Sequence, residues 1–237
     1  MLLGGSRATP PLPRRMIPRE LIATAPVPGG GELRLIRRGE EYSIMLGANE
    51  LMNSRLSGSE QALAALACER ITRVQRPRML IGGLGMGFTL RAALAQLGPE
   101  AKVGVAELVP AVVEWARGPM AHIFAGSLDD PRVRIFTGDV GDMITQGPAW
   151  DAILLDVDNG PDGLTREEND LLYSREGLRT AHASLRRGGV LAIWSSAPDR
   201  SFTARLRSAG FQVEEHEVRA NAGRRGARHT IWIAVRP

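Results

Sequence analysis

The feature that most constrains the fold is a glycine turn between an apolar run and the start of a helical pattern. The segment Met79–Phe88 has four glycines within six positions, and Glu107 ends the next apolar run, twenty residues after the last of them. Glycine lets the backbone approach a ligand closely, and an acid at the next strand end can accept both hydroxyls of a ribose. The pattern predicts a nucleoside-bearing ligand, although glycines at this density also occur in plain tight turns.

Length and composition fit one soluble α/β domain with a small appendage. The chain has 237 residues, 43% apolar and 24% charged, and no uncharged apolar stretch approaches the roughly 20 residues of a membrane-spanning helix. The N-terminus lacks the apolar middle region of a secretory signal, and the single cysteine, Cys68, excludes an intramolecular disulfide. We expect a cytoplasmic protein that does not contact a membrane, with Cys68 as a buried apolar residue.

The positive charge is a poor argument for a nucleic-acid partner. The net charge is +4 and the pI about 10.1, and basic surfaces gain affinity for phosphates by releasing counterions. However, 29 of the 30 basic residues are arginine, Lys102 is the one lysine, and they are spread along the chain. A compositional bias toward arginine explains this better, so we expect no nucleic-acid partner. The segment Arg224–Arg228 is the one place where such binding would be sought.

Changes in composition divide the chain into three parts. Residues 1–18 are rich in proline and are expected to form a disordered arm, because they cannot bury enough apolar surface to fold. Residues 19–56 contain short alternating pieces separated by glycines, which predicts an N-terminal β region. Residues 57–237 are expected to form the main domain. Because a few short strands are only marginally stable alone, the β region should pack on this domain or on a second subunit, and we expect a homodimer.

Strands and helices alternate through the main domain, which predicts a parallel sheet with helices on both faces. The last two strands have no helix between them, so they must pair as an antiparallel hairpin. This ending resembles the class I S-adenosylmethionine-dependent methyltransferase fold, a Rossmann-like α/β fold with a seven-stranded, mostly parallel sheet. The expected elements after the glycine turn include a helix near Tyr173–Ser184 and strands over Ala101–Glu107, Val133–Phe136, Ala152–Asp156, Gly189–Ser195, Phe211–Arg219 and His229–Val235.

Acidic residues follow successive strands of this sheet. Glu107 ends the second strand, Asp139 follows the third, and Asp156 ends the fourth with Asp158 two residues later. Ligands of doubly wound sheets bind beyond the carboxyl ends of the strands, so these acids should meet at one crevice. Each also has a structural explanation: Asp139 as a helix cap, Glu107 as a solvated strand end, and Asp158 as part of an Asx turn.

These residues resemble the spermidine synthase family of polyamine aminopropyltransferases, across roughly residues 32–237. The glycine turn is similar to the family's GGGDGG loop, and Glu107 matches its ribose-binding acid. Single pieces are weak signals, but their order and spacing agree. The other matching segments are Glu50–Ser54, the helix start at Ser59–Glu60, Gly138–Val140, Asp156–Pro161, and Leu172–Glu176.

The resemblance implies decarboxylated S-adenosylmethionine as donor and a small polyamine-type amine as acceptor. Asp156 would accept a proton from the amine or orient it, and Asp158 would bind an ammonium end of the acceptor. The residues implied in binding the donor are Gly82, Gly83, Gly85, Glu107, Asp139 and Val140.

Three positions depart from the family pattern. Gly85 replaces an aspartate that helps hold the donor's ammonium group, Met52 replaces a glutamine, and Trp194 stands where a glutamine usually follows the fifth strand. Ordinary S-adenosylmethionine carries a carboxylate, whose approach the loss of an acid would ease. The alternatives are therefore a methyltransferase that uses this donor and a non-catalytic nucleoside-binding relative.

No metal site is expected, because the four histidines are far apart and lack metal-ligand spacing. They are interpreted as surface or packing residues. The four tryptophans lie in or beside apolar runs and are interpreted as core residues rather than as stacking platforms.

Overall fold

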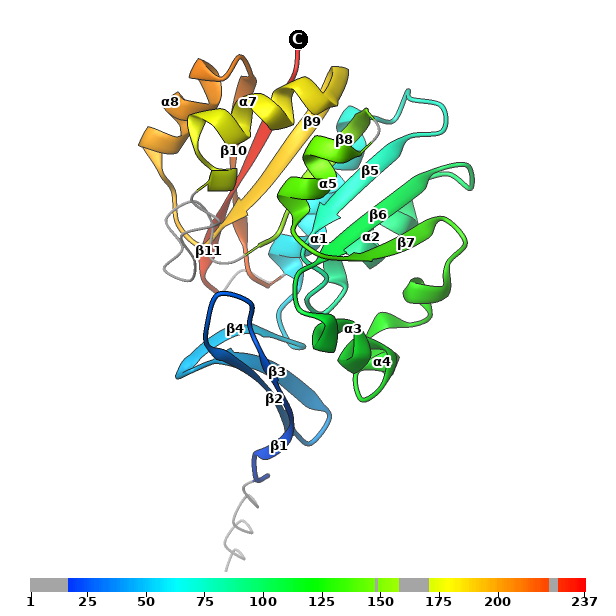
Figure 1. Ribbon diagram of the computed structural model, residues 1–237, viewed down its shortest axis with the longest axis vertical. Coiled ribbons are helices and arrows are strands. Elements are labelled where there is room, and N and C mark those ends of the chain that lie inside the picture. The colour runs from blue at the N-terminus through cyan, green and yellow to red at the C-terminus, as the bar shows by residue number, and fades with distance from the viewer. Residues whose placement is uncertain (1–16, 148, 158–170, 222–225) are drawn as a thin grey trace, which may run out of the picture.

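The computed structural model describes residues 17–147, 149–157, 171–221 and 226–237. Within these ranges the chain forms a small antiparallel sheet and a larger, mostly parallel sheet with helices on both faces (Figure 1). This arrangement agrees with the predicted fold and with its N-terminal β region. The predicted arm, residues 1–18, lies almost wholly outside the described residues.

The N-terminal sheet is a meander in the order β1-β2-β3-β4. Alternate residues of its middle strands are buried, and Leu35 lies opposite Ile44 across the β2–β3 pair. These side chains share one apolar core with α1 and α2, so the sheet packs on the main domain, one of the two placements predicted for it. The strands are β1 (Glu20–Pro26), β2 (Glu32–Arg38), β3 (Glu41–Leu46) and β4 (Asn49–Asn53).

The large sheet has the order β10-β11-β9-β8-β5-β6-β7. Five neighbouring strands run parallel to one another, in the order β9, β8, β5, β6 and β7. Strand β11 is antiparallel to both of its neighbours, β9 and β10. The predicted C-terminal hairpin is therefore confirmed. The chain fills the β6–β7 side before it crosses to β8, so the strand order reverses at β5 and β8, where crevices form in such sheets. The strands are β5 (Arg78–Gly82), β6 (Lys102–Glu107), β7 (Val133–Thr137), β8 (Trp150–Leu155), β9 (Leu185–Ser195), β10 (Gln212–Arg219) and β11 (Arg228–Val235).

Helices cover both faces of the large sheet with two apolar cores. One core joins α1, α2 and α3 with the N-terminal sheet, and the other joins α5, α7 and α8. No helix in the described ranges is long and apolar enough to cross a membrane. The helices are α1 (Gly58–Arg70), α2 (Phe88–Gln96), α3 (Pro110–Arg117), α4 (Ala121–Phe124), the 3₁₀ turn η1 (Ser127–Asp129), α5 (Val140–Gln146), α7 (Arg175–Ser184) and α8 (Arg200–Ser208).

Several predicted boundaries differ from the structure by one or two residues, as at β8, which ends at Leu155 rather than Asp156, and two further differences have a local cause. The helix expected from Tyr173 begins at Arg175, because the Ser174 hydroxyl caps it by accepting a hydrogen bond from Gly177 N at 3.1 Å. The strand expected from Gly189 begins at Leu185, which already pairs with the edge of β8. Neither change moves a strand end that faces the predicted crevice.

Candidate active site

A cavity of about 390 Å³ lies at the carboxyl ends of the parallel strands, and residues of the N-terminal sheet close it from the opposite side. It crosses the large sheet from Gly138 after β7 to His229 at the start of β11. The predicted acids Glu107, Asp139 and Asp156 all line it. The side chains with ionisable groups along its wall are Glu50, Glu60, Glu107, Asp139, Asp156 and His229.

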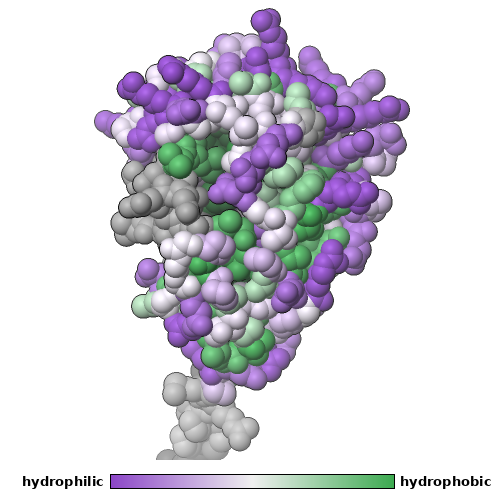
Figure 2. All heavy atoms as spheres, in the orientation of Figure 1, coloured by the Kyte–Doolittle hydropathy of each residue, from purple (hydrophilic) through white to green (hydrophobic). Residues whose placement is uncertain are grey.

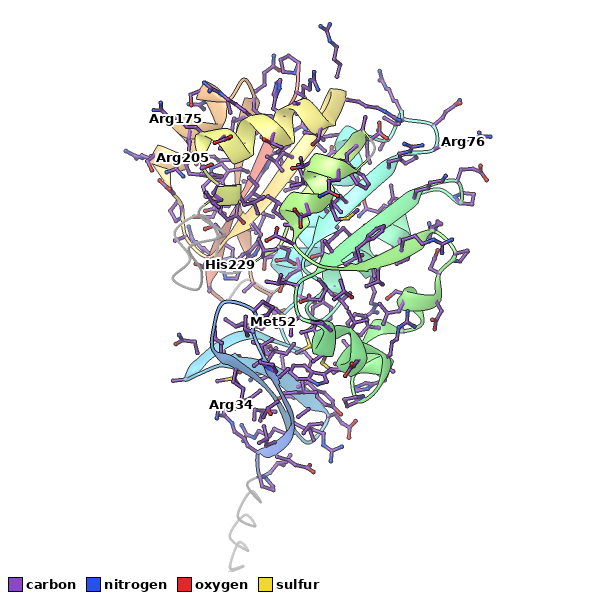
Figure 3. All side chains as sticks on the ribbon, viewed as in Figure 1. Arg34, Met52, Arg76, Arg175, Arg205 and His229 are labelled. Carbon is purple, nitrogen blue, oxygen red and sulfur yellow. The ribbon has the colours of Figure 1, made fainter. Side chains whose placement is uncertain are left out.

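The cavity is acidic although the protein as a whole is basic. Five carboxylates line it, and no arginine or lysine of the described residues does so. Of the labelled residues, Met52 and His229 lie where the N-terminal sheet meets the large sheet, Arg34 lies on the N-terminal sheet, and Arg76, Arg175 and Arg205 lie in the outer parts of the main domain (Figure 3). Hydrophilic residues likewise crowd the upper rim of the molecule, and apolar residues gather toward the middle of the same face (Figure 2). The wall of the cavity therefore favours a cationic ligand.

The glycine turn forms the floor of the cavity. Gly83, Gly85 and Gly87 have φ angles of +87°, +50° and +75°, a region that other residues seldom adopt. A Cβ on Gly83 would lie 2.5 Å from the carbonyl oxygen of Asp156. Gly82, which was predicted to bind the ligand, does not line the cavity. Its lack of a side chain instead admits Val140, whose Cγ2 would lie 2.9 Å from a Cβ there.

Glu107 fixes the turn as well as lining the cavity. One carboxylate oxygen accepts a hydrogen bond from Leu84 N at 2.9 Å, and the other accepts one from Val109 N at 2.9 Å. Burial raises the pKa of Glu107, and these backbone donors partly oppose the rise. Glu107 is only 8% exposed, so the expectation of a solvated strand end is wrong. Its carboxylate ties the glycine turn to the start of α3.

Asp139 has the cap role that the sequence allowed. Its Oδ1 accepts a hydrogen bond from Gly141 N at 2.6 Å, at the N-terminus of α5. Asp139 and Val140 also line the cavity, on the side of β7. Capping and ligand contact are compatible here, because the second carboxylate oxygen is not used by the cap.

Asp156 directly follows β8, at the point where the strand order reverses. Its Oδ2 accepts a hydrogen bond from Thr89 Oγ1 at 2.7 Å, and Thr89 lies in the first turn of α2. Burial, followed by the nearby charge of Glu60, raises the pKa of Asp156 to about 7, against the opposing effect of the Thr89 hydrogen bond. Asp158, the other predicted catalytic residue, lies outside the described residues.

Glu60, at the start of α1, is a cavity carboxylate in a segment that matches the family pattern, and it was not among the predicted site residues. It lies beside Ser59, whose Oγ donates a hydrogen bond to Glu60 Oε2 at 2.7 Å. Ser59 Oγ is also 2.9 Å from Nδ1 of His229, a residue 170 positions away in sequence. No local pattern signals this contact, because it depends on how α1 packs against β11.

Trp194 lines the cavity at its β9 end, so its interpretation as a core residue is incomplete. Its ring is half-buried and packs edge-on against His229, with 4.7 Å between ring centroids and 77° between planes. His229 was interpreted as a surface or packing residue, and it also lines the cavity. Burial lowers the pKa of His229, which favours the neutral ring.

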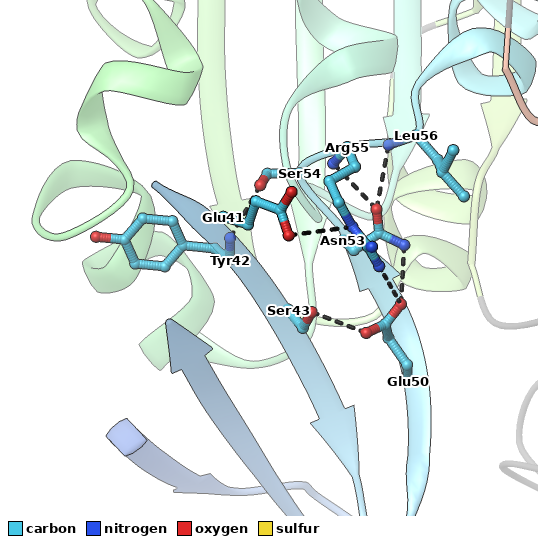
Figure 4. Close-up of polar contacts among 8 residues, drawn as sticks. All are labelled: Glu41, Tyr42, Ser43, Glu50, Asn53, Ser54, Arg55 and Leu56. Atoms are coloured by element: carbon cyan, nitrogen blue, oxygen red, sulfur yellow. Dashed lines mark hydrogen bonds and ion pairs between the residues drawn. The ribbon is translucent and has the colours of Figure 1, made fainter. Parts of the chain in front are cut away.

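Glu50 is the carboxylate contributed by the N-terminal sheet. It accepts hydrogen bonds from Ser43 Oγ at 2.8 Å and from Asn53 Nδ2 at 2.9 Å (Figure 4). Nη2 of Arg55 lies 3.8 Å from Oε1 of Glu50. Among the described residues, Glu50 is the one cavity carboxylate with a basic side chain in ion-pair range. Its charge is therefore partly balanced.

Met52 and Gly85, two of the positions that depart from the family pattern, lie against each other. A Cβ on Gly85 would be 2.8 Å from Met52 Sδ. A side chain at position 85 would therefore require Met52 to move, and no carboxylate is held at this point of the turn. Within the described ranges, no group of three metal-ligating side chains could hold a metal ion.

No protein-family model matches the chain. A polyamine aminopropyltransferase of Mycobacterium tuberculosis (strain H37Rv) is 30% identical over 197 residues, which cover 79% of this chain and 36% of that protein. Polyamine aminopropyltransferase 2 of Pseudomonas aeruginosa is 32% identical over 157 residues, covering 61% of this chain and 42% of the relative. The chain thus matches less than half of the length of these curated relatives.

The fold is similar to that of a solved spermidine synthase. The crystal structure of spermidine synthase from Thermotoga maritima superposes with a TM-score of 0.71 and 17% sequence identity. The superposition covers 92% of this chain and 72% of that one, so it includes the N-terminal sheet as well as the large sheet.

Proposed function

Because this chain is spermidine synthase-like in both sequence and fold, we propose that it transfers an aminopropyl group from decarboxylated S-adenosylmethionine to an amine acceptor. The observation that carries this proposal is the charge of the cavity wall: five carboxylates and, among the described residues, no arginine or lysine. Both substrates of the reaction are cations.

The charge of the wall also favours one donor over another. Decarboxylated S-adenosylmethionine has a sulfonium and an ammonium group, and both are attracted to carboxylates. Ordinary S-adenosylmethionine has an additional carboxylate, which would face acidic side chains without a basic partner from the described wall. We infer that the decarboxylated donor binds more tightly.

The order of the strands suggests where each substrate lies. The nucleoside would bind over β5, β6 and β7, where Gly83, Glu107 and Asp139 line the cavity. The acceptor would lie over β8, β9 and β11, beside Glu60 and Trp194. Asp156 stands between these two regions, as the reacting centre requires.

Asp156 would take the proton that the acceptor must lose. The neutral nitrogen attacks the carbon next to the sulfonium, a C–N bond forms, and the C–S bonding electrons return to sulfur to leave a neutral thioether. A base with a pKa near 7 is suited to accept the nitrogen's proton at neutral pH. Thr89 would hold Asp156 in place, and alignment of the two substrates would supply much of the rate. Asp158 stays a predicted ammonium-binding residue.

Methyl transfer is the second candidate, and the Gly85–Met52 contact favours it. The expected partner of the donor's ammonium group is missing from the turn, and Met52 fills the space. Ordinary S-adenosylmethionine carries a carboxylate beside its ammonium group, and the absence of an acid from the turn would ease the approach of that carboxylate.

Turnover with each donor over a panel of amines, followed by mass spectrometry of the products, separates the candidates. We expect aminopropylated amine from the decarboxylated donor, no product with Asp156→Asn, and normal turnover with the control Asp142→Asn, which changes an exposed acid of α5 outside the cavity. Methylated product from the ordinary donor, with none from the decarboxylated one, would replace the proposal by the second candidate.

We also propose that the protein acts in the cytoplasm as a homodimer. β1 is an edge strand of the N-terminal sheet, and its Leu21 is 56% exposed. Light scattering on the purified protein should give twice the chain mass of 25.6 kDa. A monomeric mass at working concentration would rule out the dimer.

A further inference from the structure

We propose that Glu60 is a positioning residue, held by Ser59 and His229, that keeps the carboxyl group of Asp156 ready to accept a proton from the acceptor amine. Its part in the reaction rests on the proposed function. The arrangement of Ser59, Glu60, Asp156 and His229 and the titration of these groups do not rest on the proposed function, so they can be tested separately from it.

His229, Ser59 and Glu60 form a row of hydrogen bonds in which each donor points toward Glu60. A hydroxyl has a single proton, and Ser59 Oγ donates it to Glu60 Oε2 at 2.7 Å. In the hydrogen bond of 2.9 Å between His229 Nδ1 and Ser59 Oγ, the imidazole must then be the donor and the hydroxyl oxygen the acceptor. His229 therefore carries its hydrogen on Nδ1 and leaves Nε2 without one while the ring is neutral.

The packing of the fold holds the row in place. α1, which carries Ser59 and Glu60, packs against β8, β9 and β11. The indole of Trp194 packs on the ring of His229 and restricts its rotation. Glu60 is thereby held where it lines the same cavity as Asp156.

The other carboxylates on the described part of the cavity wall are hydrogen-bonded to other groups. Glu50 is bonded to Ser43 and Asn53, Glu107 to the backbone of the glycine turn and α3, and Asp139 to the first turn of α5. Among the described residues, Glu60 is the one whose charge raises the pKa of Asp156, because the two carboxylates repel each other when both are ionised.

This repulsion has a consequence for catalysis. Two close carboxyl groups retain a proton at a higher pH than either would alone, so they titrate as a pair. The charge of Glu60 makes Asp156 the stronger base, and a cationic acceptor relieves the repulsion when it binds. Burial also raises the pKa of Glu60, and its bond from Ser59 opposes the rise.

The test is a titration of the ligand-free protein by NMR with ¹³C-labelled aspartate carboxyl groups, in which Asp156→Asn identifies the Asp156 signal. In Glu60→Gln the midpoint of Asp156 should move to lower pH, because the repelling charge is gone. The control Glu69→Gln, which changes an exposed acid of the same helix, should leave it unmoved. In Ser59→Ala the Glu60 carboxyl group loses its hydrogen-bond donor. The lower of the two titration midpoints of the Glu60–Asp156 pair should therefore move to higher pH. An Asp156 midpoint that is equal in Glu60→Gln and the unmodified protein would overturn the proposal.

A second measurement does not depend on how these variants fold. ¹⁵N shifts of the unmodified protein should show His229 as the Nδ1–H tautomer at neutral pH, and the Nε2–H tautomer would contradict the row. If the protein transfers aminopropyl groups, the acidic limb of its kcat/KM profile should also move to lower pH in Glu60→Gln. Absence of transfer would count against the proposed function, and it would leave the titration result standing.

Discussion

At the scale of single residues, Glu107 combines two tasks that the sequence presented as alternatives. Its carboxylate accepts hydrogen bonds from Leu84 N and Val109 N, and it lines the cavity where a ribose is expected. A residue with both tasks should affect binding and stability when it is changed. The two effects can be measured separately.

Glu107→Ala should weaken binding of methylthioadenosine by about 1.5–3 kcal/mol, the range for hydrogen bonds to a charged group. It should also lower the free energy of unfolding by about 1–3 kcal/mol, since two buried backbone donors lose their partner. Calorimetry and urea denaturation measure the two quantities. Glu114→Ala, at an exposed position of α3, should change neither. Unchanged nucleoside affinity in a folded Glu107→Ala protein would remove the ribose role.

Asp156 should make stability depend on pH. Its pKa is raised from 3.8 to about 7 in the folded protein, so between these values the folded state holds a proton that the unfolded state has lost. The free energy of unfolding therefore falls as pH rises through this window. Asp156→Asn removes the effect and should be more stable than the unmodified protein at pH 8 by about 1–4 kcal/mol, but not at pH 4. Thermal unfolding at both pH values tests this, and equal stability at pH 8 would mean that the Asp156 carboxylate is not destabilised by burial.

At the scale of structural elements, the glycine turn works because its backbone runs close to the end of β8. Gly83 has a φ of +87°, and a Cβ there would lie 2.5 Å from the Asp156 carbonyl oxygen. Gly83→Ala should therefore cost about 2–4 kcal/mol of stability, through left-handed strain and the clash. Gly98→Ala has open space around the new Cβ and should be neutral or stabilising by up to about 1 kcal/mol. Urea denaturation compares them, and equal stability of the two variants would contradict the close approach.

Local patterns were enough to predict most elements. Alternation in the N-terminal sheet and apolar runs in the large sheet predicted the strands to within a few residues, because each strand buries one or both faces. The start of α7 differs from the prediction because the Ser174 cap, rather than the apolar period, determines it. The extra length of β9 depends on pairing with Trp150, which sequence alone does not reveal.

The candidate site was predictable where its residues follow strand ends in order. Glu107, Asp139 and Asp156 meet because parallel strands share one carboxyl edge. The row formed by His229, Ser59 and Glu60 was not predictable, because α1 and β11 are far apart in the chain and meet only through packing. The contact of Trp194 with the cavity was not predicted for a related reason: an indole at a strand end can pack on the core and also line the cavity.

At the scale of the whole molecule, the main feature is the separation of charge. A chain with net charge +4 keeps its arginines and lysine out of the described cavity wall and places five carboxylates there. Such a distribution attracts small cations to the cavity, and its effect on binding should weaken as salt is added.

The most direct test of this account compares the two donors. Calorimetric titration at low salt should give at least about tenfold tighter binding of decarboxylated S-adenosylmethionine than of the ordinary donor, equivalent to about 1.4 kcal/mol. The preference should diminish in Asp156→Asn and at high salt, since it depends on the carboxylates of the wall. Equal or tighter binding of ordinary S-adenosylmethionine would contradict the claim that this cavity selects a purely cationic donor.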